Sequence, residues 1–305
     1  MSTLSVGSWM TFEYLPREAG VAVLTAARDA GIDFFDDARY DDHSRSAPMK
    51  TEYSEVVFGE IFRAVGFVRD RTVVANKLWW EFWPGESAAQ ELDGSLRRMG
   101  FDYIDLIYAN PPPEGLGVPD LVRAVGELIS SGKARAWGIV NWPAPLIAEA
   151  VEAAGSLGVP PLAAAQLPYS VVRRSPVEDQ DMEEVLRGAD IPVVASDVLA
   201  GGALTGKYAS DKDAAEKTTG RVAKRLDDPR LRRAFEAGER LRAVARRTGT
   251  TPAPMAIAYA LSNPGVASVL FGATSAAQIM ENTSAVDLLS SIDDALLAEL
   301  RQIAP

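Results

Sequence analysis

The hydrophobic positions along the chain change their period repeatedly, from short apolar runs to longer segments with helical spacing. The apolar runs, which we predict to be strands, are Leu4–Trp9, Asp33–Asp36, Thr72–Lys77, Tyr103–Ala109, Ala134–Val140, Leu162–Leu167, Ile191–Val198 and Ala267–Gly272. The predicted helices, with apolar residues three and four positions apart, are 17–30, 53–64, 86–99, 120–131, 144–154 and 178–187. Apolar strands that alternate with helices are typical of a parallel sheet covered on its outside.

The number of predicted strands and the length of 305 residues favour a closed (β/α)₈ TIM barrel. An open, doubly wound sheet is the alternative. No segment rich in Pro, Gly and Ser divides the chain, so we predict one domain over residues 1–305. The longest irregular stretch, 199–229, follows the seventh predicted strand, and long loops at such places are often functional.

Composition narrows the class of protein. The net charge of −11 argues against binding to nucleic acid or to an anionic membrane surface. The chain has no Cys, which excludes disulfides, thiolate catalysis and sulfur-ligated metals, and we expect no metal site. No signal peptide and no apolar run of about 18 residues is visible. We therefore expect a cytoplasmic protein, for which the sequence leaves a homo-oligomer open.

Polar residues stand at the ends of five predicted strands. They are Asp36, Lys77, Asn110, Asn141 and Gln166. The carboxyl ends of the strands of a parallel barrel meet at one mouth, where active sites lie. We therefore predict that these side chains form the polar floor of a pocket for a cofactor or a substrate.

Asp36 and Lys77 end adjacent predicted strands, so we expect them to pair. A structural ion pair between two strands is the alternative interpretation. Tyr40 follows Asp36 by four residues, in the loop that leaves the same strand. An ammonium group next to a phenol favours its ionised form, and a Tyr tuned in this way can give a proton to a carbonyl oxygen as hydride reaches the carbon.

These residues lie in motifs that resemble a known family. The run GIDFFDDARY (31–40) resembles the Gly-Ile-x-x-Phe-Asp-Thr-Ala-x-x-Tyr signature of the aldo-keto reductases. VVANK resembles the strand with their catalytic Lys, and YIDLIYANPP resembles the strand that usually ends in their catalytic His. The runs VGSWMTF, SEVVFGE, LAGGALTGKY and SVLFGATSAAQIMEN are similar to one branch, the potassium-channel β-subunit group and its bacterial relatives. The resemblance covers the whole chain.

The resemblance implies an oxidoreductase that reduces a small carbonyl compound with NADPH. It implies Asp36, Tyr40, Lys77 and Asn110 as the catalytic residues. Asn110 stands where most members have His, and the channel β-subunit group also has Asn there. An Asn can orient a carbonyl oxygen by donating a hydrogen bond, but it cannot relay a proton.

The resemblance also implies a set of cofactor-binding residues. They are Trp9, Asn141, Gln166, Asp197, Leu199, Lys207, Arg221, Gly272, Thr274, Gln278, Glu281 and Asn282. Asn141 and Gln166 would hold the nicotinamide carboxamide, and Leu199 and Lys207 the pyrophosphate. The run GATS opens a predicted helix, whose N–H groups and positive dipole end suit a phosphate. Arg221 is the candidate for the 2′-phosphate, and an Arg on a solvated face is the alternative.

The sequence departs from the family pattern in four places. Tyr40 lies one residue closer to Asp36 than in the signature, so the loop must bulge differently for the hydroxyl to reach Lys77. Val140 replaces the Ser that usually precedes the carboxamide-binding Asn, and Ser196 replaces the aromatic residue that stacks on the nicotinamide. The chain also begins on its first predicted strand, where the family has a hairpin. None of these departures removes the predicted dinucleotide site.

An aromatic segment follows Lys77 at the predicted mouth. Trp79 and Trp80 are the candidates for an apolar substrate wall, with Phe82 and Trp83 close behind. A lid packed against a neighbouring helix or subunit is the alternative. The main functional hypothesis is carbonyl reduction, and the second is an NADPH-binding regulatory or redox-sensing partner protein with little turnover.

Overall fold

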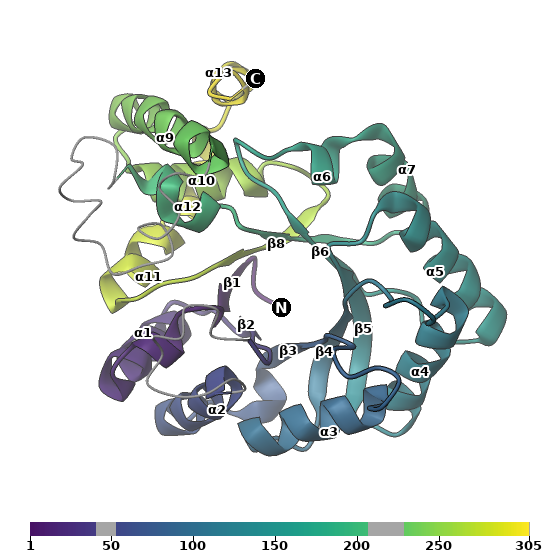
Figure 1. Cartoon of the computed structure of the whole chain (residues 1–305). Coiled ribbons are helices and arrows are strands. Elements are labelled where there is room, and N and C mark those ends of the chain that lie inside the picture. The colour runs from purple at the N-terminus through teal and green to yellow at the C-terminus, as the bar shows by residue number, and fades with distance from the viewer. Residues whose placement is uncertain (41–52, 207–228, 305) are drawn as a thin grey trace.

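The computed structural model describes residues 1–40, 53–206 and 229–304 (Figure 1). Eight parallel strands close into one barrel in the order β1 to β8. The strands are β1 Leu4–Gly7, β2 Phe34–Asp36, β3 Val73–Leu78, β4 Ile104–Ala109, β5 Ala134–Val140, β6 Ala164–Pro168, β7 Val193–Ser196 and β8 Val266–Phe271. The predicted TIM barrel is confirmed, and the open sheet is excluded because β1 pairs with both β2 and β8.

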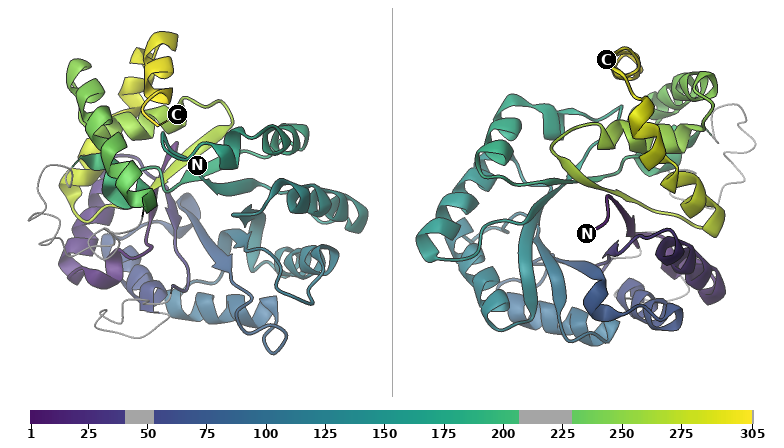
Figure 2. Two further views of the ribbon diagram at one scale, coloured as in Figure 1. Left: turned by 45° about the horizontal axis from the view of Figure 1, so that its top comes forward. Right: turned by 180° about the vertical axis from the view of Figure 1, so that it is seen from behind.

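Helices surround the barrel in both views of Figure 2. The α-helices are α1 Arg17–Asp29, α2 Tyr53–Val65, α3 Ala88–Met99, α4 Val118–Ser130, α5 Ala144–Leu157, α6 Ser175–Glu178, α7 Gln180–Gly188, α9 Pro229–Arg247, α10 Pro252–Leu261, α11 Ala276–Thr283, α12 Ala285–Leu288 and α13 Asp294–Arg301. Short 3₁₀ turns are η1 Phe12–Tyr14, η2 Arg69–Arg71, η3 Ala200–Thr205 and η5 Leu289–Ser291. All six predicted helices are present.

Helix α3 illustrates how local sequence sets the ends of an element. Ser87 and Gln90 form a capping box at its start, which satisfies two backbone N–H groups that the helix leaves open. Gly100 ends the helix with φ 70°, the left-handed conformation that favours glycine and that the sequence predicted. These two signals set the ends of the helix, which packs against β3 and between α2 and α4.

Helix α10 is one of the elements that the sequence pattern does not reveal. Every residue from Ala253 to Leu261 is buried, because α10 packs under α9, α11 and α12 as well as against β8. A helix that is apolar all round has no polar face, so its period of 3.6 residues does not stand out in the sequence.

Two cores fill the fold. The larger lies between the strands and the helices, and the smaller consists of alternate strand residues that share the barrel interior. The inner residues are Phe34, Ala75, Leu106, Tyr108, Val140, Ala164, Val194 and Leu270. Gly138 allows this packing, because a Cβ there would lie 2.2 Å from the carbonyl oxygen of Ala164 and 3.2 Å from the Tyr108 ring.

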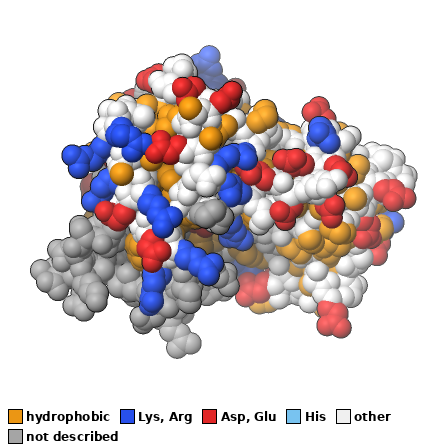
Figure 3. Space-filling model, turned by 90° about the horizontal axis from the view of Figure 1, so that it is seen from above, with side chains coloured by type: hydrophobic (Ala, Val, Ile, Leu, Met, Phe, Trp, Pro, Cys, Tyr) orange, Lys and Arg blue, Asp and Glu red, His pale blue; other side chains and the backbone are white. Residues whose placement is uncertain are grey.

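The face that carries α9 and α13 is uneven in charge. Most of its basic side chains gather on one half, while acidic side chains are spread over both halves (Figure 3). Two arginines of α9 hold the end of the chain, since Arg240 donates to the carbonyl of Ile303 and Arg247 pairs with Glu299. The described residues include no helix long and apolar enough to cross a membrane, and within them no group of three or more His, Cys, Asp or Glu could hold a metal ion.

Candidate active site

The structure brings the predicted strand-end residues to one mouth of the barrel. Asp36 is the last residue of β2 and Lys77 lies near the end of β3. Asn110 and Asn141 directly follow β4 and β5, and Gln166 lies within β6. Their common position follows from the parallel order of the strands.

Asp36, Tyr40 and Lys77 form one hydrogen-bonded group. The Lys77 ammonium donates to Oδ2 of Asp36 and, at 2.8 Å, to the Tyr40 hydroxyl. The Tyr40 hydroxyl lies 3.3 Å from the same carboxylate oxygen, and Gln166 Nε2 donates to the other oxygen at 3.1 Å. The predicted pairing of Asp36 with Lys77 is therefore present, and the shorter loop still lets Tyr40 reach Lys77.

The residues that lead from β2 to Tyr40 are anchored by side chains of α2 and of the segment after β3. The Ser54 hydroxyl donates to the Ala38 carbonyl at 2.6 Å and accepts from the Tyr40 amide at 3.3 Å. The Arg39 side chain donates to Glu81 at 2.5 Å and lies over the Phe82 ring, with its guanidinium carbon 4.8 Å from the ring centroid. These contacts hold Ala38, Arg39 and the Tyr40 backbone, so the fold sets the position of the Tyr40 hydroxyl.

The charges of Asp36 and Lys77 lie almost out of contact with solvent. The exposed fraction is 2% for Asp36 and 5% for Lys77. Burial of an unpaired charge costs several kcal/mol, so each group needs the other. The Tyr108 side chain lies in the barrel interior, where burial first and the Asp36 charge second raise its pKa well above the ordinary value, so Tyr108 stays neutral.

Asn110 stands beside this group without joining it. Its side-chain amide donates to the carbonyl of Leu78 at 3.0 Å, and its backbone carbonyl accepts from the Trp80 indole at 3.2 Å. The Asn110 side chain is half-buried. The end of β3 therefore orients Asn110, while Asp36, Tyr40 and Lys77 orient one another.

Two exposed indoles flank Tyr40. The ring of Trp9 lies 6.2 Å from the Tyr40 ring, and Trp79 lies 6.0 Å away in an edge-to-face arrangement. Their exposed fractions are 42% and 36%. Trp80 differs, because it is only 4% exposed and packs edge-to-face against Trp83. Of the two predicted substrate-wall residues, Trp79 alone borders Tyr40 from the surface.

Backbone strain gathers at the mouth, which the sequence did not indicate. Within the described residues, most non-glycine residues with positive φ follow the carboxyl end of a strand. They are Met10, Trp80, Asn141, Asp197 and Ala200, with φ between 47° and 60°. Such conformations cost energy and cluster at functional sites. Among these five residues, only Asn141 and Asp197 are of types that adopt positive φ readily, so the sequence gives only a weak indication of this strain.

The predicted carboxamide residues lie side by side on β5 and β6. The Asn141 backbone N–H donates to the Gln166 carbonyl at 3.0 Å, and the Asn141 side chain is exposed. The Gln166 side chain is 4% exposed and bridges to Asp36. The Asn141 side chain thus faces solvent, and the Gln166 side chain links β6 to Asp36 at the end of β2.

The start of α11 forms the far side of the mouth. Ser275 caps the helix by accepting from the Gln278 backbone, and the Thr274 backbone N–H donates to the Gln278 side chain at 2.7 Å. Gly272, Thr274 and Ser275 are exposed directly after β8. Glu281 is half-buried and accepts from the Thr251 hydroxyl at the surface, whereas Asn282 is buried.

The segment after β7 turns sharply. The exposed Asp197 accepts from the Gly201 backbone at 3.0 Å, while Ser196 and Leu199 are half-buried. Gly201 and Gly202 both have positive φ within η3. The predicted contacts Lys207 and Arg221 lie outside the described residues.

A second buried carboxyl, Asp37, was missed by the sequence reasoning although the double Asp of FFDDARY was visible. Asp37 is 0% exposed and accepts from the Ser8 hydroxyl, while its Oδ2 atom has no hydrogen-bond partner in the described part of the chain. Burial first and the nearby Glu55 second raise the pKa of Asp37 well above the ordinary value. Asp37 therefore lies near Glu55 of α2 and is hydrogen-bonded to Ser8, which follows β1.

Comparison with known proteins agrees with this geometry. The family model described as "Aldo/keto reductase family" matches residues 3–304. A protein of Oryza sativa subsp. japonica named "probable voltage-gated potassium channel subunit beta" is 33% identical over 306 residues, covering 95% of this chain and 88% of that protein. A protein of Arabidopsis thaliana with the same name is 32% identical over 318 residues, covering 99% of this chain and 93% of that protein. The chain therefore belongs to the aldo/keto reductase family.

Proposed function

We propose that this protein reduces an aldehyde or ketone to an alcohol with NADPH, and that Tyr40 supplies the proton. Membership of the aldo/keto reductase family supports oxidoreductase chemistry with a nicotinamide cofactor on a small carbonyl compound. The observation that carries the finer proposal is the 2.8 Å contact between the Lys77 ammonium and the Tyr40 hydroxyl, with Asp36 paired to the same ammonium.

The proton step follows from this contact. The Lys77 ammonium stabilises negative charge on the Tyr40 oxygen, which makes the hydroxyl a better proton donor to a carbonyl oxygen. Asp36 holds the ammonium in place and balances its charge in a buried site. Asn110 is the candidate to donate a further hydrogen bond to the same carbonyl oxygen, and Trp79 the candidate wall for its apolar body.

The residues at the mouth fit a nicotinamide dinucleotide. The N-terminus of α11, exposed after β8, has the N–H groups and positive dipole end that favour a phosphate. Asn141 presents an exposed amide on the β5 side, where a carboxamide group could pair with it. The bound cofactor would supply the hydride, while the chain supplies the proton and excludes water.

Single-turnover kinetics tests the proton step. Bound NADPH should be oxidised by an aromatic aldehyde, and Tyr40→Phe should slow this step by about 10²–10⁴-fold, the usual contribution of a general acid. The NADPH dissociation constant should stay within about twofold, since the phenol is not expected to hold the cofactor. Tyr103→Phe is the matched control, because Tyr103 packs between two arginines away from the mouth. Equal rates in Tyr40→Phe and wild type would refute the role of Tyr40.

A regulatory partner protein that binds NADPH and turns over little is the second candidate function. Two observations favour it: the names of the two plant relatives, and Asn110, which cannot relay a proton and already donates to the Leu78 carbonyl. Tight NADPH binding without any aldehyde-dependent oxidation would select this function. Absence of both NADPH and NADH binding in a fluorescence titration would reject both functions.

A further inference from the structure

The end of β3 pairs with β4 on one side, but on its β2 side the N–H of Lys77 is held by a side chain and not by the backbone of β2. Strand β2 stops at Asp36, and the chain then turns away to bring Tyr40 back to the mouth. The backbone N–H of Lys77 donates instead to the side-chain oxygen of Asn76, at 2.7 Å. The backbone from which the catalytic ammonium extends therefore depends on the orientation of the Asn76 side chain.

A buried ionic chain sets that orientation. The Asn76 amide nitrogen donates to Oε1 of Glu55 at 2.9 Å, and Arg98 Nε donates to Oε2 of the same carboxylate. Glu55 and Asn76 are both 0% exposed. The amide nitrogen of Asn76 must face Glu55, because a carboxylate can only accept a hydrogen bond. The amide oxygen of Asn76 is thereby left to accept from the Lys77 N–H.

The charges around Glu55 come from three elements. Arg98 of α3 is the paired cation and Asn76 of β3 is neutral. Asp37 after β2 is a second carboxyl, whose pKa is raised first by burial and then by the Glu55 charge. Glu13 of η1 adds a further negative charge near Asp37. Arg98 is thus the cation that balances a carboxyl-rich site behind the catalytic strand.

We propose that Glu55, Asn76 and Arg98 form a positioning unit that holds the Lys77 end of β3, and through it the contact of the Lys77 ammonium with Tyr40. The effects expected on kcat rest on the proposed function, whereas the effects expected on hydrogen exchange in β3 do not. The unit touches neither the substrate nor the cofactor. It acts on Lys77 only through the backbone of β3.

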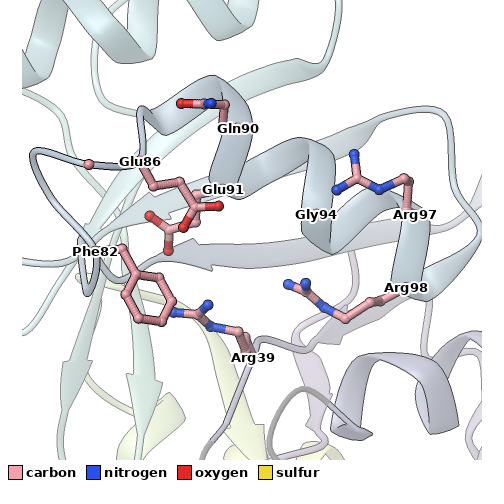
Figure 4. Close-up of a pocket in the computed structure, with 9 residues that line it drawn as sticks. Arg39, Phe82, Glu86, Gln90, Glu91, Gly94, Arg97 and Arg98 are labelled. Carbon is pink, nitrogen blue, oxygen red and sulfur yellow. The ribbon is translucent and has the colours of Figure 1, made fainter.

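Arg98 reaches Glu55 from the wall of a cavity of about 490 Å³ beside α3. Figure 4 shows Arg98 extending from α3 along this cavity, whereas the Arg39 guanidinium turns to the Phe82 ring. Gly94 leaves room for Arg98, since a Cβ at Gly94 would lie 3.0 Å from the guanidinium. A small cation added in solution therefore has a route to Glu55 when the Arg98 side chain is removed.

Hydrogen–deuterium exchange of the β3 segment tests the structural half without any need for turnover. Asn76→Ala removes the acceptor of the Lys77 amide, and Glu55→Gln removes the carboxylate that orients Asn76. Both should raise exchange at the end of β3 by about tenfold or more, as expected when a protecting hydrogen bond is lost. Glu60→Gln is the control on the same helix, because Glu60 pairs with Arg17 at the surface. Unchanged exchange at the end of β3 in both test variants would overturn the proposal.

Chemical rescue gives the kinetic readout. Arg98→Ala should lower kcat by about tenfold with KM nearly unchanged, and move the alkaline limb of kcat to higher pH, because a displaced ammonium favours the Tyr40 phenolate less. Ethylguanidinium at millimolar concentration should restore both, whereas ethylammonium should restore less. A loss of folded protein alone, with the alkaline limb unmoved and no rescue, would mean a merely structural role. If the wild-type protein shows no turnover, the proposed function is rejected. The hydrogen–deuterium exchange experiment would then still test whether Glu55, Asn76 and Arg98 hold the end of β3.

Discussion

The two sides of the barrel mouth are built in different ways. On the β2–β3 side Asp36 and Lys77 are each 5% exposed or less and pair with each other. On the β7–β8 side the polar groups are exposed, with Thr274 and Asp197 at sharp turns and at a helix start. Proton transfer requires groups fixed before the substrate arrives, whereas a dinucleotide requires donors that face outward.

This difference teaches where substitutions should be costly. A buried charge that loses its partner destabilises the whole fold, because no water replaces the lost contact. A donor on an exposed turn loses only its contact with the ligand, because water satisfies it otherwise. Stability and turnover should therefore be coupled on the β2–β3 side and separable on the β7–β8 side.

The largest expected effect is that of Lys77→Met. Turnover should fall by about 10³-fold, because Tyr40 loses the ammonium that favours its phenolate. The free energy of unfolding should fall by about 3–5 kcal/mol, since Asp36 is left buried without its cation. Steady-state kinetics and urea unfolding measure the two effects. Lys133→Met, which breaks a half-exposed pair with Asp93, should cost about 1 kcal/mol or less. Equal losses in the two variants would break the contrast between buried and exposed charges.

The next effect concerns pH and Asp37. Burial raises the pKa of Asp37 in the folded protein above the ordinary value of 3.8, so the folded state binds a proton that the unfolded state has released. The contribution of Asp37 to stability is therefore present below pH 3.8 and declines as pH rises toward the raised pKa, by up to about 1.4 kcal/mol per pH unit.

Asp37→Asn should flatten this dependence, because the amide still accepts from Ser8 but carries no titrating proton. Urea unfolding at pH 5 and pH 8 measures the difference, and the variant should gain stability relative to wild type at the higher pH. Asp29→Asn is the control, since the Asp29 side chain is 61% exposed. A wild type and an Asp37→Asn variant with parallel pH profiles would contradict the assignment of Asp37 as a neutral acid.

The smallest effect sharpens the comparison from the β7–β8 side. Ser275→Ala removes the cap of α11, which should cost about 1 kcal/mol and weaken NADPH binding by about fivefold, with turnover at saturating NADPH unchanged. Asp293→Ala removes an equivalent cap from α13, so it should cost similar stability without any change in NADPH affinity. Fluorescence titration separates the two variants. Equal NADPH affinities in both would remove α11 from the proposed cofactor site.

Much of the fold could be predicted because each element carries its own signal. The strand β5 was predicted with its observed bounds, Ala134–Val140, since an apolar run ends there at a polar residue. Strand β7 is shorter than its predicted range, because Asp197 adopts a positive φ that ends the strand. Helix α10 was missed because it has no polar face.

Less of the candidate site than of the fold could be predicted from the sequence. Trp79 and Trp80 look alike in sequence, but only Trp79 is at the surface, because Trp80 adopts a positive φ that directs its indole toward Trp83. Asp36 and Asp37 are adjacent in sequence, but successive side chains of an extended chain point to opposite sides. The Asp36 carboxylate pairs with Lys77 at the mouth, and the Asp37 carboxyl lies near Glu55 of α2. Side-chain direction after a strand ends depends on backbone angles that residue type alone does not set.

By itself, the sequence determined the alternation of strands and helices, hence the barrel, and the polar residues at the strand ends. These are local properties, since hydrophobic period and turn residues act within a few positions. The tertiary structure decided which polar groups touch: Tyr40 and Lys77 meet across 37 residues, and Gln166 and Asp36 across 130. Such contacts exist only after the barrel closes, because closure fixes the register that brings distant strand ends within hydrogen-bond distance.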